Sequence, residues 1–160
     1  MLIRVSLAQQ TLTLFDDGGE VVASCPVSTA ASGAGEACGS YCTPRGRHLV
    51  RAKIGAGQAA NTVFVGRRPT GETYTPQLGS EFPERDWILT RILWLSGCEP
   101  EFNRLGSVDT MRRYVYIHGC PDDLAIGVPG SHGCIRMRND DIVALFDQVP
   151  LYTSVEISET

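Results

Sequence analysis

The sequence predicts a mainly β protein with one clear amphipathic α-helix near the C-terminus, and three observations support this. Short runs rich in β-branched and aromatic residues recur along the chain, separated by Gly, Pro, Asp and Asn. Only residues 139–149 show apolar residues at helical spacing. The 160-residue chain has no repeat, low-complexity tract or linker, so we expect residues 1–160 to form a single domain.

The strands are predicted from period-2 alternation and from the turn residues between them. Asp16-Asp17-Gly18-Gly19 reads as the turn of a hairpin, and residues 32–39 form a loop of small residues. A last short strand is expected around Val155 and Ile157. The other predicted strands cover residues 2–7, 11–15, 21–27, 47–54, 62–65, 88–95 and 113–118.

The helix prediction begins at Asn139, which is expected to be the N-cap. Asp140 and Asp141 then lie in the first turn, where negative charge complements the helix dipole. Pro150 should end the helix. The apolar stripe at i, i+3, i+4 and i+7 consists of Ile142, Leu145, Phe146 and Val149.

Charge and hydropathy exclude some classes of protein. Fourteen Lys and Arg against eighteen Asp and Glu give a net charge of -4. The clustered basic excess of a protein that binds nucleic acid or a membrane surface is missing. No apolar run approaches the roughly 20 residues that span a bilayer. We therefore expect neither nucleic acid nor membrane as a partner, and the sequence gives no oligomeric state.

The N-terminal residues and the cysteines suggest a compartment. Residues 1–7 already alternate like a strand and lack the long apolar stretch of a secretion signal, so we expect a cytoplasmic protein. Six cysteines are then expected to stay reduced. They are Cys25, Cys38, Cys42, Cys98, Cys120 and Cys134.

The chemistry concentrates between residues 114 and 139. Strand alternation puts Tyr116 and His118 on one face of one predicted strand. The same alternation puts Cys134 and Arg136 on one face of a second segment. A thiol with a neighbouring imidazole suits acyl transfer, because the imidazole can lower the thiol pKa and carry its proton. Gly133 would let the backbone approach a substrate carbonyl, so that amides there stabilise an oxyanion.

The cysteines and Ser131 also allow other interpretations: a buried core residue, a zinc site or a serine hydrolase. A single cysteine is more often a small buried hydrophobe than a nucleophile. A zinc site built from Cys38, Cys42, Cys120 and a histidine lacks a second Cys pair, so no metal or other cofactor is expected. Ser131 fails the G-x-S-x-G pattern of serine hydrolases, because Pro129 stands at the first glycine.

Residues 126–137 resemble the signature of the YkuD-type L,D-transpeptidase catalytic domain family. That signature is an upstream His-Gly followed, about fifteen residues later, by Ser-His-Gly-Cys; here His118-Gly119 precedes Cys134 by 16 positions. Cys120 departs from the family, which more often has threonine there. Further matching segments are Gln10-Thr11-Leu12, Pro26-Val27-Ser28-Thr29, Thr43-Pro44-Arg45-Gly46, Asn139 and Asp141.

The resemblance implies a β-sandwich or barrel-like sheet with the helix packed on it. It also implies that Cys134 is the nucleophile and His118 the general base, with the Gly119 carbonyl orienting the imidazole. His132 and Gly133, together with the Cys134 amide, would form or support the oxyanion hole.

The resemblance also implies a substrate, the peptidoglycan stem peptide or a soluble muropeptide. Arg136 is expected to hold a substrate carboxylate, and Ser131 and Tyr116 are expected to contact substrate. Cys134 would attack the carbonyl between meso-diaminopimelate and D-Ala and form a thioester.

Three functions remain open at this stage. If water resolves the thioester, the protein is an L,D-carboxypeptidase that trims tetrapeptides in muropeptide recycling. If an amine resolves it, the protein is an L,D-transpeptidase. A non-catalytic stem-peptide-binding module is the third. The expected cytoplasmic location favours the carboxypeptidase, because crosslinking requires polymeric wall outside the membrane.

Overall fold

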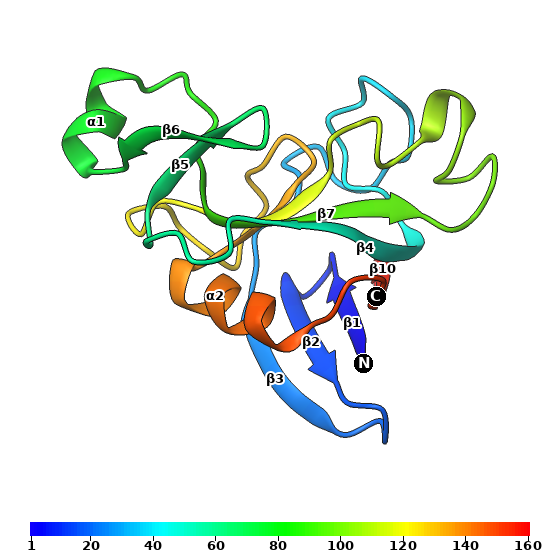
Figure 1. Ribbon diagram of the computed structural model, residues 1–160. Coiled ribbons are helices and arrows are strands. Elements are labelled where there is room, and N and C mark those ends of the chain that lie inside the picture. The colour runs from blue at the N-terminus through cyan, green and yellow to red at the C-terminus, as the bar shows by residue number, and fades with distance from the viewer.

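The computed structural model describes all residues, 1–160, and has ten strands in one strongly curled sheet (Figure 1). The predicted mainly β fold is confirmed. The strands are β1 (Leu2–Ser6), β2 (Thr11–Phe15), β3 (Val21–Pro26), β4 (Gly46–Ile54), β5 (Thr62–Val65), β6 (Arg68–Thr73), β7 (Ile88–Gly97), β8 (Tyr116–Gly119), β9 (Ile135–Met137) and β10 (Ser154–Ser158).

The strand order is β3-β2-β1-β10-β4-β7-β5-β6, and β8 branches from β7 to pair with β9. The ten-residue β7 is the hub of the sheet, since it pairs with β4, β5 and β8. Only β1–β10 and β8–β9 are parallel pairs. This branch brings β8 and β9, which carry the candidate chemistry, side by side over the middle of β7.

The main core lies between the curled sheet and α2 (Asn139–Gln148). Figure 1 shows α2 in the angle between the β1–β3 strands and the β4–β7 layer. The four residues of the predicted apolar stripe are all buried there: Ile142, Leu145, Phe146 and Val149. No helix is both long and apolar enough to cross a membrane.

The structure corrects the start of this helix. Its N-cap is Arg138, and Asn139 is the first helical residue. The Asn139 side chain is buried instead of capping the helix. Its amide donates to the Cys120 carbonyl at 3.0 Å, and its oxygen accepts from Thr90 Oγ1 at 2.5 Å. The Asn139 side chain therefore joins the helix start to β7 and to the residue that follows β8.

The structure also ends the predicted strands 2–7 and 21–27 one residue earlier, shortens the one at 113–118, and adds β6, a short α-helix and a short 3-10 helix at Gly106–Val108. The strand expected at 113–118 begins only at Tyr116, because Tyr114 has a left-handed backbone with φ 57°. Strand β6 was not predicted because Pro69 and Gly71 interrupt its pattern; it lies at the edge of the sheet, where proline is tolerated. The short helix α1 (Pro76–Glu81) has Thr75 as its N-cap.

Candidate active site

The two catalytic candidates lie on neighbouring parallel strands. In the β8–β9 register, His118 pairs with Arg136 and Ile117 pairs with Ile135. The two isoleucines enter the main core, whereas Cys134 packs beside Tyr116 in a separate small cluster. The predicted alternation is therefore present, with the thiol and the imidazole on the face opposite the core. Same-face positions along one strand are about 7 Å apart, so the two side chains are neighbours.

The thiol of Cys134 is held by backbone groups of the segment before β8. Its Sγ accepts from the Tyr116 amide at 3.3 Å and donates to the Tyr114 carbonyl at 3.4 Å. The left-handed backbone at Tyr114 brings that carbonyl to the sulfur. Burial raises the thiol pKa to about 12, although the Tyr116 amide and the cations of Arg136 and Arg113 oppose this rise. The resting thiol is therefore protonated.

The imidazole of His118 is fully buried, and its hydrogen bond identifies the tautomer. Nδ1 lies 2.6 Å from the Gly119 carbonyl oxygen, which only accepts, so Nδ1 carries the hydrogen. Burial lowers the pKa of His118, against the opposing charge of Asp86, and the ring is neutral at pH 7. Nε2 has no hydrogen-bond partner. An unprotonated nitrogen is therefore available on the Cys134 face.

The loop before Cys134 is built from polar contacts to a distant segment. Thr43 Oγ1 donates to the Gly133 carbonyl at 3.0 Å. Gly133 has φ 128°, and a Cβ there would lie 3.1 Å from the Cys42 carbonyl oxygen, so glycine is required. The Gly133 amide donates to Ser131 Oγ at 3.2 Å, whereas the Cys134 amide has no acceptor within the protein.

Ser131 is held inside this loop. Its side chain is buried, and its hydroxyl donates to the Cys134 carbonyl at 2.5 Å while accepting from Gly133. These contacts occupy the group that was expected to contact substrate. Ser131 shapes the loop instead.

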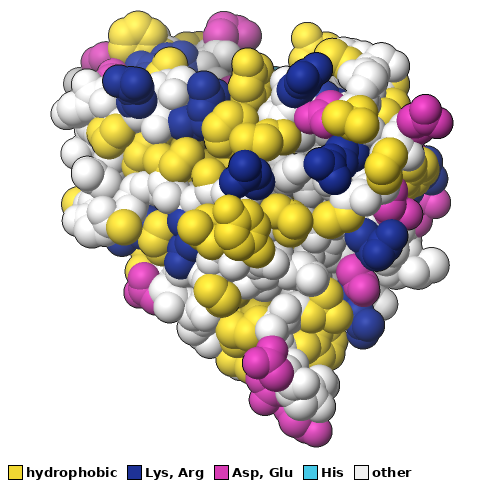
Figure 2. Space-filling view, turned by 45° about the vertical axis from the view of Figure 1, so that its right-hand side comes forward, with side chains coloured by type: hydrophobic (Ala, Val, Ile, Leu, Met, Phe, Trp, Pro, Cys, Tyr) yellow, Lys and Arg dark blue, Asp and Glu magenta, His cyan; other side chains and the backbone are white.

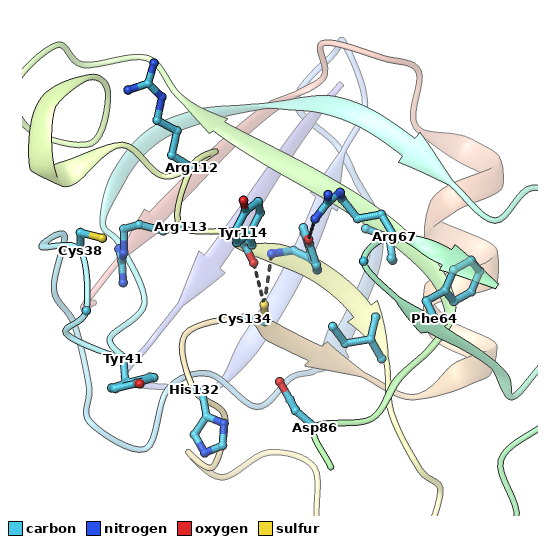
Figure 3. A pocket seen from close by; sticks show the side chains of 15 residues that line it. Cys38, Tyr41, Phe64, Arg67, Asp86, Arg112, Arg113, Tyr114, His132 and Cys134 are labelled. Atoms are coloured by element: carbon cyan, nitrogen blue, oxygen red, sulfur yellow. Dashed lines mark hydrogen bonds between the residues drawn. The ribbon is translucent and has the colours of Figure 1, made fainter. Parts of the chain in front are cut away.

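Cys134 lies in the wall of a cavity of about 760 Å³ (Figure 3). The size suits a ligand of a few residues. Figure 3 shows Arg112 and Arg113 on one side of the sulfur and Arg67 on the other, with His132 and Asp86 below. The lining residues are Cys38, Gly39, Tyr41, Phe64, Gly66, Arg67, Asp86, Ile88, Ile92, Arg112, Arg113, Tyr114, Tyr116, His132 and Cys134.

Arg136 does not line this cavity, which corrects its place in the predicted site. Its guanidinium donates to the Gly130 carbonyl at 3.1 Å and pairs with Asp86 at 3.3 Å. With a side chain only 15% exposed, it is largely committed to these partners. Arg136 instead borders a second cavity of about 510 Å³, which shares Asp86 and His132 with the first.

Most residues of the cavity were not predicted from the sequence as site residues, among them Arg67, Arg113 and Tyr41. Each of these three is supplied by a loop or turn, and no motif marks it. Arg113 donates to the Cys42 carbonyl at 2.6 Å and to Gly35 at 3.3 Å, which fixes the 35–42 loop over the cavity. In the structure, backbone strain marks two of them: Tyr41 and Arg67 have φ values of 57° and 64°.

No group of three or more His, Cys, Asp or Glu side chains lies close enough together to hold a metal ion. The groups that the site offers for chemistry are the thiol, the imidazole and the backbone amides. A cysteine paired with a neutral histidine on adjacent strands, in the wall of a peptide-sized cavity, defines a cysteine acyl-transfer enzyme.

Comparison with known proteins identifies the family. The profile of the YkuD L,D-transpeptidase catalytic domain matches residues 1–157. The chain therefore belongs to this family of peptidoglycan-crosslinking enzymes. The probable L,D-transpeptidase YbiS of Escherichia coli K12 is 33% identical over 125 residues, which cover 72% of this chain and 40% of that protein. The probable L,D-transpeptidase ErfK/SrfK of the same strain is 35% identical over 119 residues, covering 65% and 35%.

Solved structures share the fold at lower identity. An L,D-transpeptidase (residues 123-326) from Xylanimonas cellulosilytica aligns over 98% of this chain and 59% of that one, with TM-score 0.60 and 20% identity. L,D-transpeptidase 3 from Mycobacterium tuberculosis, solved with a faropenem-derived adduct, aligns over 99% and 60%, with TM-score 0.60 and 19% identity. The matched part spans about two fifths of the first curated relative.

Proposed function

We propose that residues 1–160 act as one catalytic unit, an L,D-carboxypeptidase that removes D-Ala from peptidoglycan tetrapeptides through a thioester on Cys134. The observation that carries this proposal is the unpartnered Nε2 of neutral His118 on the strand beside Cys134. The substrate class follows from membership of the family.

The proton path starts from a neutral pair. The Cys134 thiol gives its proton to His118 Nε2 as Sγ attacks the carbonyl between meso-diaminopimelate and D-Ala. The tetrahedral intermediate then expels the D-Ala amine, which takes that proton, and leaves a thioester. Water attacks the thioester, gives a proton to Nε2 and breaks the C–S bond, and the sulfur recovers the proton. In the resting structure the thiol donates to Tyr114, so it must rotate to reach Nε2.

The oxyanion of the intermediate needs backbone donors near Sγ. The Cys134 amide is free to donate, whereas the Gly133 amide is already bound to Ser131. We assign the main oxyanion contact to the Cys134 amide. Gly133 and Ser131 then act by holding the loop in the shape that points this amide outward. The exposed His132 stands at the rim, with its ring 6.1 Å from that of Tyr41.

Hydrolysis in the cytoplasm is part of the same proposal. A cavity of about 760 Å³ fits the end of a short soluble peptide. The six cysteines are all free thiols, which suits a reducing compartment.

A second candidate function is L,D-transpeptidation, and the second cavity favours it. The two cavities meet at Asp86 and His132, so a second stem peptide could approach the thioester from the other side. Its amine would then replace water as the nucleophile. Both functions use the same thioester and differ only in what resolves it.

The test is mass spectrometry of the protein and its products after incubation with free tetrapeptide. We expect D-Ala and tripeptide as products and a transient adduct on the protein, because the thioester retains the tripeptide acyl group. Cys134→Ala should abolish both adduct and product. Adding an acceptor stem peptide should change D-Ala release by less than about twofold, since water resolves the thioester.

The control variant is Cys120→Ala, which removes a buried thiol that donates to the Met137 carbonyl at 3.3 Å in the core. It should retain most of the activity. Equal loss in both cysteine variants would contradict a single nucleophile. Crosslinked dimer as the main product would replace the carboxypeptidase with the transpeptidase.

A further inference from the structure

Arg67 stands at the tip of the β5–β6 hairpin in a conformation that arginine rarely adopts. Val65 pairs with Arg68, so the turn consists of Gly66 and Arg67 alone, with φ values of 56° and 64°. Two left-handed residues in a two-residue turn favour Gly or Asn at the second position. In this conformation the Arg67 side chain folds back over the sheet and lines the Cys134 cavity.

The Arg67 guanidinium is fixed by aromatic rings. It lies 4.7 Å from the centroid of the Trp94 ring and 5.0 Å from that of Tyr114. Its Nη1 donates to the Tyr116 hydroxyl at 3.0 Å (Figure 3). Cation–π stacking holds a guanidinium without using its N–H donors. The group is therefore oriented before any ligand arrives.

The guanidinium has no acidic partner. Of the other arginines near Cys134, Arg113 binds backbone carbonyls of the 35–42 loop and Arg136 pairs with Asp86. Arg112 also lines the cavity, on the side of the sulfur opposite Arg67 (Figure 3). Arg67 forms no salt bridge, and only one of its five N–H groups is used. A fixed, unpaired guanidinium in a cavity wall is the arrangement that binds a carboxylate through two parallel hydrogen bonds.

Tyr116 connects this guanidinium to the nucleophile. Its hydroxyl accepts from Arg67, so its own O–H remains free to donate, and its amide donates to Cys134 Sγ. Tyr116 would therefore bind the carboxylate through its hydroxyl and Cys134 Sγ through its backbone amide. The length of the Tyr116 side chain would then set the distance between the carboxylate and the sulfur.

We propose that Arg67 selects the acyl donor by binding one of its free carboxylates, with the Tyr116 hydroxyl as a second donor. This inference rests on the proposed function for its substrate class and adds the recognition residue. Two free carboxylates of the donor lie next to the bond that is cleaved: the C-terminal carboxylate of D-Ala and the side-chain carboxylate of meso-diaminopimelate.

The experiment measures binding in the Cys134→Ala protein, which cannot turn over. Three ligands are compared: the tetrapeptide, the tetrapeptide amidated at D-Ala, and the tetrapeptide amidated at the side chain of meso-diaminopimelate. We expect one amide to bind about 10- to 100-fold more weakly than the free acid, because a charge-assisted pair is lost. The amide that loses affinity identifies the carboxylate.

Arg67→Gln in the same background should bring this acid-to-amide ratio close to one, and Arg67→Lys should give an intermediate ratio, since it keeps charge without the planar fork. Arg68→Gln is the matched control, because it removes the same charge from the neighbouring exposed residue of the hairpin. It should leave the ratio unchanged. Urea unfolding of each variant checks that the fold is retained.

Three results would each overturn the role of Arg67. The acid-to-amide ratio is unchanged in Arg67→Gln, or it falls equally in Arg68→Gln, or the free acid binds no more tightly than either amide. The proposed function is tested separately, since its failure appears as absence of D-Ala release by the wild-type protein. The binding ratio does not depend on that release.

Discussion

The resting state of Cys134 and His118 differs from the thiolate–imidazolium pair of many cysteine enzymes. The sequence predicts that the imidazole lowers the thiol pKa, but burial raises the pKa of Cys134 to about 12 and lowers that of His118. Charge separation is unfavourable because His118 is fully buried and Cys134 is half-buried. The proton should therefore move during attack and not before it.

This neutral pair predicts a pH profile. Activity requires unprotonated Nε2, so it should be lost only as pH falls through the His118 pKa, which lies below the usual 6.5. On the alkaline side, no fall is expected near pH 8–9, because no imidazolium needs to be retained. Measurement of kcat/KM for tetrapeptide from pH 4 to 10 should give a plateau above an acid limb below 6.5.

The same measurement distinguishes the alternative. A thiolate–imidazolium pair would lose activity as the imidazolium deprotonates, giving a bell with an alkaline limb near pH 8–9. That bell would contradict the neutral pair. Methylation of Cys134 by a small electrophile in the same pH range is the control, since it reports thiol reactivity without substrate binding.

The shared face of Cys134 and His118 was predictable because strand parity and the motif both refer to local sequence. Cys134 and His118 each follow a period-2 pattern that puts them on the face opposite the core. The role of Arg136 was not predictable in this way, because its ion pair with Asp86 joins segments 50 residues apart. Sequence alternation gives the face of a side chain and does not give its partner.

At the scale of elements, strands with an apolar pattern were predicted well and the polar edge strand β6 was not. Strands β2 and β5 match the predicted residues 11–15 and 62–65: β2 alternates buried and half-buried residues, and β5 is an almost fully buried apolar run. The short β6, at the edge of the sheet, has no buried residue and therefore no apolar pattern to detect. Its hairpin nevertheless supplies Arg67 to the cavity.

Asn139 shows how an element boundary supports the site. Besides the Cys120 carbonyl, its amide donates to Asn61 and Asp122 at 3.0 and 3.1 Å. A Cβ on Gly119 would lie 2.5 Å from Asn139 Oδ1, so the helix start packs directly on the residue that orients His118. Asn139 is thus a positioning residue for the turn after the base.

Asn139→Asp should test this positioning. It keeps the shape and the acceptor for Thr90 but removes both N–H donors, which three oxygens share, and places a carboxylate against the Cys120 carbonyl. We expect the free energy of unfolding in urea to fall by about 1–3 kcal/mol. Because the His118–Gly119 turn should loosen, kcat should fall more than KM rises.

The control for this variant is Asp140→Asn, which changes charge at the next, exposed position. It should cost less than about 1 kcal/mol through the helix dipole and leave kcat unchanged. A destabilised Asn139→Asp protein with unaltered kcat would show that the network serves the fold alone.

At the scale of the whole molecule, the curl of the sheet assembles the cavity from four distant segments. These are the 38–41 loop, the β5–β6 hairpin, the 112–114 turn and the loop before β9. No local pattern predicts this assembly, because it depends on how β7 pairs with three strands at once. The fold class could therefore be predicted from the sequence more fully than the cavity.

The charge distribution follows from the same assembly. The chain has a net charge of -4, yet the Cys134 cavity is lined by three arginines and one acid: Arg67, Arg112, Arg113 and Asp86. Figure 2 shows Lys and Arg interspersed with hydrophobic side chains across one face, with Asp and Glu mostly toward its edges and at its lower tip. The sequence predicts that Arg136 holds a substrate carboxylate, whereas the arginines that line this cavity, Arg67, Arg112 and Arg113, come from loops and turns.

A cationic cavity on an acidic protein should make recognition of the anionic donor salt-dependent. Exposed charges are screened over about 8–10 Å at ordinary ionic strength and over about 3 Å at 1 M. Raising NaCl from about 0.05 to 0.5 M should therefore raise KM for the free tetrapeptide several-fold. It should change kcat by less than about twofold, because the buried Cys134–His118 pair is shielded from added ions. The comparison donor has both carboxylates amidated; its KM should stay nearly constant. Equal salt effects on the two donors would show that salt acts on the protein, and not on the attraction between the arginines and the carboxylates.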